Sequence, residues 1–181
     1  MPPDSSHAKG YVREEVAKPE MILTTHAVVG GALASLFPAN PIVAIAAGFV
    51  SHFAIDAIPH WDYPLQSISV AKGRRNHLKW ERPIVQDAAL IAFDACVGMA
   101  LAVGLFSAHA PVVVIMLGAI AGMLPDPLQF VHSLHPHEPL ATLQRFHWWI
   151  HSKRELDWPI GISSQVIFAA IVVWVTSALR Y

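Results

Sequence analysis

Charged side chains are scarce in this chain. Asp, Glu, Lys and Arg make up 14% of its 181 residues, whereas hydrophobic residues make up 54%. Soluble globular domains carry about 25% charged residues. The shortfall, together with long uncharged runs, argues against a soluble domain and predicts an integral membrane protein.

Two further scarcities exclude other classes of protein. The formal net charge is only −1, so no basic field is present that would attract a nucleic acid. Cys96 is the single cysteine, so an intrachain disulfide cannot form. Because Cys96 lies inside an apolar run, we expect it to be a small buried residue.

Five apolar segments follow a polar start. Residues 1–20 are mixed in charge and contain three prolines, and we expect a mobile tail that is not a signal peptide; Met21 could be the native start. Residues 21–181 are predicted to form one all-α membrane domain. The third and fifth segments can cross a hydrocarbon core of ~30 Å, whereas the other three are shorter than the usual ~20 residues, and whether they fully span stays open. The segments cover residues 22–37, 42–58, 84–107, 111–125 and 159–179.

The connections between the segments differ sharply in length and charge. Short turns at 37–41 and 107–111 predict two helical hairpins, whereas the connections at 59–83 and 126–158 are long and polar. With five crossings, the tail and both long connections lie on one side, together with eleven of the twelve Lys and Arg residues. Only Arg180 lies on the other side. The positive-inside rule then places the long connections in the cytoplasm, beneath an inner membrane.

Histidines and aspartates gather on the same predicted side. His26 lies near the start of the first segment, and His52 and Asp56 lie near the end of the second. Residues four apart share one helical face, so His52 with Asp56, and His147 with His151, could each bind one ion. Imidazole and carboxylate ligands without thiolates fit Zn²⁺ best, with Mn²⁺ or Fe²⁺ as alternatives. We expect one to three ions.

Catalytic and substrate-binding roles are predicted for residues close to these pairs. Asp94 and Asp126 could bridge two ions, or one of them could act as a general base. Arg145, Lys153 and Arg154 lie close in sequence to the His147 pair and could hold a substrate phosphate. Contact with lipid headgroups explains these three cations equally well.

Simpler explanations exist for individual motifs. One His-x3-Asp pair arises often by chance, and His60 could belong to an aromatic belt at the membrane interface. His135 and His137 are expected to be solvated bystanders, and Trp148 and Trp149 are expected to anchor an interfacial helix. The prediction of a metal site therefore depends on the whole set lying on one side, because ionisable residues inside a membrane are usually functional.

A resemblance to a known family is carried by three motifs: THAVVGGALAS (25–35), HFAIDAIPH (52–60) and HWWIHS (147–152). They resemble the bacterial membrane-bound metal-dependent hydrolases and, more distantly, the zinc-dependent phospholipase C family, which binds a cluster of zinc ions in an all-helical fold. Histidine at 151 stands where those phospholipases have glutamate. The resemblance implies metal-ligand roles for His26, His52, Asp56, His60, His147 and His151.

We therefore expect an integral-membrane metal-dependent hydrolase of an ester or phosphoester that could be lipid-linked. Its partners would be membrane lipid and that substrate, not nucleic acid. Two other functions stay open. One is a non-catalytic membrane protein with a structural metal ion, and the other is a metal or proton transporter, which needs a polar route to both sides. The sequence does not fix the substrate or the oligomeric state.

Overall fold

The computed structural model describes residues 22–61, 68–69, 77–78, 82–154 and 156–179. The predicted tail and most of the connection at 59–83 lie outside this part of the chain. Within it, seven α-helices form, together with one antiparallel pair of two-residue strands. The elements are α1 (Leu23–Ala34), α2 (Pro41–Asp56), β1 (Ile68–Ser69), β2 (His77–Leu78), α3 (Arg82–Phe106), α4 (Val112–Met123), α5 (Pro125–Leu134), α6 (Leu140–Ile150) and α7 (Trp158–Ala178).

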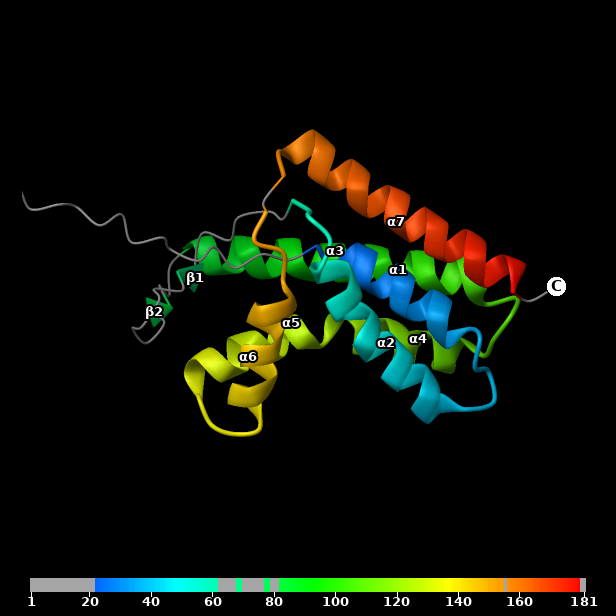
Figure 1. The fold of residues 1–181 in the computed structure, drawn as a ribbon, viewed down its shortest axis with the longest axis horizontal. Helices are drawn as coiled ribbons and strands as arrows, with labels where there is room; N and C mark the ends of the chain where they lie inside the picture. Colours follow the sequence, from blue (N-terminus) through cyan, green and yellow to red (C-terminus); the bar gives the residue numbers. More distant parts are fainter. Residues whose placement is uncertain (1–21, 62–67, 70–76, 79–81, 155, 180–181) are drawn as a thin grey trace, which may run out of the picture.

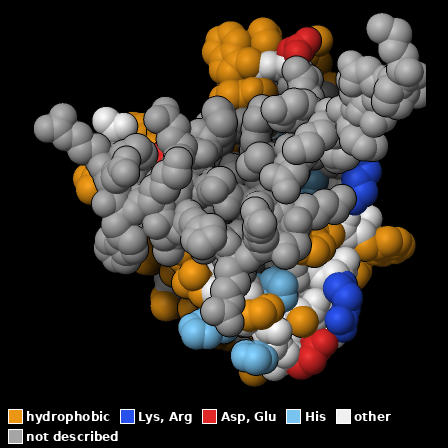
Figure 2. Space-filling model, turned by 90° about the vertical axis from the view of Figure 1, so that its left-hand side faces the viewer, with side chains coloured by type: hydrophobic (Ala, Val, Ile, Leu, Met, Phe, Trp, Pro, Cys, Tyr) orange, Lys and Arg blue, Asp and Glu red, His pale blue; other side chains and the backbone are white. Residues whose placement is uncertain are grey.

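The axes of the apolar helices are roughly aligned, and α5 and α6 lie together at one end of them (Figure 1). The short turns after α1 and after α3, and the C-terminal end of α7, lie at the opposite end (Figure 1). The two predicted helical hairpins are therefore present. Figure 2 views the end with α5 and α6, where histidine, basic and acidic side chains lie on the surface.

Two of the helices are long and apolar enough to cross a membrane. They cover Val85–Phe106 and Trp158–Ala178. A third crossing is formed if Val112–Met123 and Pro125–His132, which meet at a bend of 42°, count as one span. The helical membrane architecture is thus supported by two or three spans, and five full crossings remain a prediction.

The fourth apolar segment, predicted at 111–125, is interrupted near its end. Pro125 has no N–H to donate, so α4 cannot continue through it unchanged. Proline is however favoured at the first position of a helix, and α5 begins there. The connection at 126–158 consequently holds two helices, α5 and α6, and not the single interfacial helix that we expected.

The short helix α1 occupies the centre of the bundle. Ten of its twelve residues are buried, and it contacts α2, α3, α4 and α7. At 1.5 Å per residue its length is only ~18 Å. Because neighbouring helices and not lipid surround it, α1 need not match the thickness of the hydrocarbon layer.

Glycines let α1, α2 and α4 approach each other closely. A Cβ atom added to Gly30 or Gly48 would overlap the backbone carbonyl of Gly118 in α4. A Cβ atom on Gly122 would lie 2.6 Å from the carbonyl oxygen of His26. Gly118 and Gly122 form the small-xxx-small spacing that allows close crossing of membrane helices. These crossings fix the positions of the helices that carry His26 and His52.

The outer faces of α3 and α7 are apolar and exposed, as expected for helices that meet lipid. Cys96 also lies on the exposed surface of α3 and not in the interior, because the apolar run that contains it faces outward. The exposed large side chains include Val85, Leu90, Phe93, Leu101 and Leu105 on α3, and Val166, Ile167, Ile171 and Trp174 on α7.

Candidate metal centre

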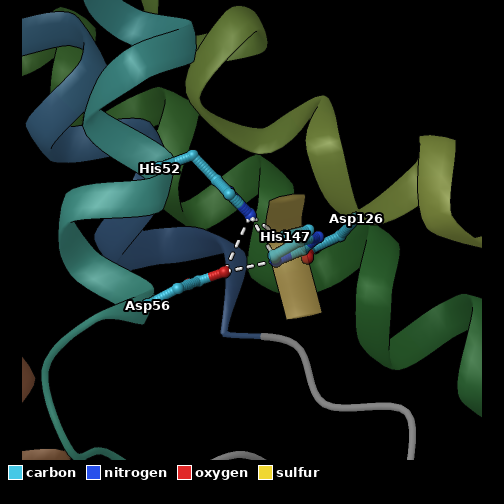
Figure 3. A group of neighbouring side chains, drawn as sticks. All are labelled: His52, Asp56, Asp126 and His147. Carbon is cyan, nitrogen blue, oxygen red and sulfur yellow. Dashed lines mark hydrogen bonds and ion pairs between the residues drawn. The ribbon is translucent and has the colours of Figure 1, made fainter. Parts of the chain in front are cut away.

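Four side chains from three parts of the fold meet beside the break between α4 and α5. His52 and Asp56 extend from α2, Asp126 from the first turn of α5, and His147 from α6 (Figure 3). One nitrogen or carboxylate oxygen from each lies within 4.8 Å of all the others. The four residues are at most 7% exposed. These sequence-predicted residues are therefore brought together, although 95 positions separate His52 from His147.

Asp56 is the central residue of this group. Its Oδ2 atom lies 3.0 Å from His52 Nε2 and 2.5 Å from His147 Nε2. The His52 contact joins neighbouring turns of α2, as the i, i+4 spacing predicted. Asp126 completes the group, with its Oδ1 atom 3.5 Å from His52 Nε2.

Backbone carbonyls determine which nitrogen of three histidines carries a hydrogen. His52 Nδ1 lies 2.9 Å from the carbonyl oxygen of Gly122, and His60 Nδ1 lies 2.6 Å from that of Ile58. His151 Nδ1 lies 3.0 Å from the carbonyl oxygen of its neighbour, Ser152. Since a carbonyl only accepts, each Nδ1 must donate, and the lone pair of the neutral ring is on Nε2. Metal-binding histidines are typically oriented in this way.

A second group of possible ligands shares Asp56 with the first. Asp56, His60 and His151 also place one donor atom each within 4.8 Å of the others. Two backbone hydrogen bonds align their segments, from Ser152 N–H to the Asp56 carbonyl and from Leu156 N–H to the His60 carbonyl. Burial lowers the pKa of His151 and so favours the neutral ring, which is the form that binds a metal ion.

His26 lies directly against the first group. Its Nε2 atom is 3.4 Å from Asp56 Oδ1, and its ring stacks on that of His52 with 4.3 Å between centroids. His26 Nδ1 is buried and has no hydrogen-bond partner in the described part of the chain. His26 nevertheless belongs to neither group of possible ligands, so its role as a metal ligand stays a prediction.

Asp94 lies in α3, where it contacts the start of α1. Its carboxylate accepts hydrogen bonds from the backbone N–H of Leu23, at 2.6 Å, and from the hydroxyl of Thr24, at 2.6 Å. A carboxylate in this place satisfies an otherwise unpaired N–H group of the first helical turn and favours the helix dipole. Asp94 belongs to neither group of possible ligands, and its catalytic role remains a prediction.

The contacts of Asp94 predict a structural effect. Replacing Asp94 with Asn should lower the free energy of unfolding by about 1–2 kcal/mol, because a neutral amide is a weaker cap than a carboxylate. The metal content of the purified protein should not change. Chemical unfolding in detergent and elemental analysis measure the two effects. A loss of bound metal on this substitution would make Asp94 a ligand.

The three cations predicted to hold a phosphate are on the exposed side of this end. Arg145 forms an ion pair with Glu138 at 2.9 Å. The hydroxyl of Thr142 lowers the pKa of this exposed glutamate. Lys153 Nζ donates to the carbonyl of Trp148, and Arg154 is exposed. Their phosphate-binding role stays a prediction.

The remaining histidines and tryptophans of this end lie at the surface. His135 and His137 are exposed and belong to neither ligand group, as expected for bystanders. Trp148 and Trp149 are also exposed, which suits side chains that enter a membrane interface.

Two buried glutamines were not singled out from the sequence. Gln165 in α7 accepts a hydrogen bond from the Thr25 hydroxyl and donates one to the carbonyl of Trp61, the neighbour of His60. It thereby holds the segment that carries His60 against α1 and α7. The other, Gln144, precedes His147 by three residues, and this spacing is the signal that could have identified it.

Comparisons with family models, curated proteins and solved structures found no match to this chain.

Proposed function

We propose that this protein is an integral-membrane metal-dependent hydrolase whose site is the cluster around Asp56. One observation carries the proposal. His52, His60 and His151 each donate Nδ1–H to a backbone carbonyl, so each ring has its Nε2 lone pair for a ligand, and all three belong to groups that contain Asp56.

A bound cation accounts for this arrangement better than hydrogen bonds alone. His52 Nε2 lies near a carboxylate oxygen of Asp56 and another of Asp126. Two carboxylates buried this close together repel each other unless positive charge lies between them. A metal ion would relieve this repulsion.

The donor set indicates the ion and its ligands. Imidazole and carboxylate donors without thiolates favour Zn²⁺, with Mn²⁺ or Fe²⁺ as alternatives. One ion would be held by the four residues of the first group, and a second by His60 and His151, with Asp56 shared between them. When bound, such ions act as Lewis acids and lower the pKa of bound water. Asp126 would either bind the first ion or, with the other three residues as ligands, act as the general base.

The position of the cluster supports a substrate carried by a lipid. Asp126 and His147 belong to α5 and α6, which lie together at one end of the apolar helices (Figure 1). Exposed Phe146, Trp148 and Trp149 on α6 are suited to the headgroup region of a bilayer. We place this end in the cytoplasm because the basic residues of the long connections follow the positive-inside rule. The substrate would be an ester or phosphoester at the membrane surface.

A purely structural ion is the second candidate. The first group offers four protein ligands and is at most 7% exposed. Structural zinc sites are closed by four protein ligands, whereas catalytic sites keep one position for water. The burial of all four residues is the observation that favours a structural ion.

Turnover of simple substrates tests the proposal. Zinc-loaded protein in detergent should hydrolyse bis(p-nitrophenyl) phosphate or phospholipid in mixed micelles. His52→Ala should lower kcat/KM by more than about 100-fold, because even the loss of a residue that only orients a metal ligand costs about 10–100-fold. His109→Ala is the matched control, because His109 is exposed in the turn after α3. Bound metal with no turnover of either substrate would favour the structural ion.

A further inference from the structure

Gln144 faces the interior beside the metal centre. Among the described residues of α6 only Gln144 and His147 are buried, and they lie three apart on one helical face. That helix contacts α5 and α2, which carry Asp126 and the pair His52 and Asp56. Gln144 therefore lies on the side of α6 that faces the cluster, one turn before a ligand of the proposed ion.

The side-chain amide nitrogen of Gln144 forms no hydrogen bond within the described part of the chain. Its Nε2 atom is buried without a hydrogen-bond partner, and the residue is 3% exposed. In the described part of the chain only one other buried side-chain atom lacks a partner, and that atom is His26 Nδ1 at the same cluster. Burying an amide N–H without a partner is unfavourable, so each such group needs an explanation.

Gln165 shows what a structural glutamine does in this protein. It is buried to a similar degree, yet both ends of its amide are hydrogen-bonded, one to Thr25 and the other to Trp61. The two glutamines thus have the same chemistry and burial but differ in whether their partners are in the fold. The missing partner of Gln144 is therefore expected to come from outside the chain.

We propose that Gln144 binds the substrate, by donating a hydrogen bond from Nε2 to an oxygen of its phosphoester group. This inference rests on the proposed function, because it needs an anionic group at the metal centre. A neutral amide does not exchange protons with substrate near neutral pH, so Gln144 orients the substrate and does not act as acid or base. Hydrogen bonds to charged oxygens are stronger than those to neutral ones, which suits a phosphoryl oxygen.

Inorganic phosphate is the probe, and calorimetric titration of zinc-loaded protein in detergent is the measurement. Gln144→Leu should weaken phosphate binding about 10- to 100-fold, the effect of losing a charge-assisted hydrogen bond. Its zinc content should equal that of the wild type, and its melting temperature should be unchanged or higher, because an unpaired buried amide has been removed. Gln165→Leu, the matched control, should lower the melting temperature and leave the affinity for phosphate unchanged.

Several outcomes would overturn the inference. Equal phosphate affinity in wild type and Gln144→Leu would overturn it while leaving the proposed function intact, provided that both proteins bind zinc. Absence of phosphate binding to the zinc-loaded wild type would also overturn the inference. A loss of melting temperature in Gln144→Leu as large as in Gln165→Leu would assign the amide to a buried structural water. Absence of bound metal in the wild type would instead remove the proposed function. If Gln144→Leu does not fold, the unbranched Gln144→Met variant gives the same comparison.

Discussion

Replacing Asp56 with Asn is expected to abolish metal binding. Asn has the same shape but no charge, and Asp56 is the residue shared by both groups of possible ligands. Removing one partner from a buried set of charges costs about 3–5 kcal/mol, which corresponds to affinity at least about 100-fold weaker. Both ions should be lost together, so elemental analysis should find far less metal per chain than in the wild type.

Loss of the ion should also appear as loss of stability. A ligand present at about 1,000 times its Kd stabilises the folded state by about 4 kcal/mol. A chelator should therefore lower the melting temperature of the wild type strongly and leave that of Asp56→Asn unchanged. Asp94→Asn is the matched control, because it makes the same chemical change at a carboxylate that contacts α1 outside the cluster. A fully metal-loaded Asp56→Asn protein would contradict the assignment of Asp56 as the shared ligand.

The second large effect is expected at the crossing of α1, α2 and α4. Gly118→Leu should lower the free energy of unfolding by about 3 kcal/mol or more, because even a Cβ atom would overlap the Ala34 side chain and the Gly30 carbonyl. Separating the helices should also weaken metal binding. The reason is that His52 is oriented by the carbonyl of Gly122, one turn along α4 from Gly118.

Gly104→Leu is the control, because it introduces the same leucine side chain at an exposed glycine. A Cβ atom on Gly104 would meet no neighbouring atom within 4 Å, and Gly104 lies on the exposed face of α3. Chemical unfolding in detergent, with zinc affinity measured on the same samples, should separate the two variants clearly. If Gly118→Leu were as stable as Gly104→Leu, the glycines would not be responsible for the close crossing.

The arrangement of the site could be anticipated for one of the two pairs with i, i+4 spacing, because His147 and His151 fall in different groups of possible ligands. The spacing of His52 and Asp56 predicted a shared face, and the two residues do contact each other. That His147 and Asp126 lie beside this pair was predicted only from their side of the membrane, because their distance from His52 depends on how α4, α5 and α6 pack. The crossing of α4 with α1 and α2 depends on glycine contacts between the helices, which no periodicity within one helix reveals.

The sequence pattern could not predict features that depend on what surrounds a helix, because hydrophobicity is the same beside lipid and beside other helices. The burial of α1 among other helices could not be told from its apolar residues, since a helix facing lipid has the same composition. Pro125 was assigned to the end of one segment, whereas it begins a new helix. The three-residue spacing of Gln144 from His147 was a weak signal, because a glutamine in a polar connection is usually solvated; its burial without a partner identifies it.

Anomalous diffraction from crystals of protein purified without added chelator would show directly whether a metal ion lies at Asp56. We expect a peak among His52 Nε2, Asp56, Asp126 and His147, with nitrogen and oxygen ligands at ~2.0–2.2 Å. A second peak is expected between Asp56 and the rings of His60 and His151. A map without a peak at the cluster, in which Asp56 and His147 remain directly hydrogen-bonded, would contradict this expectation.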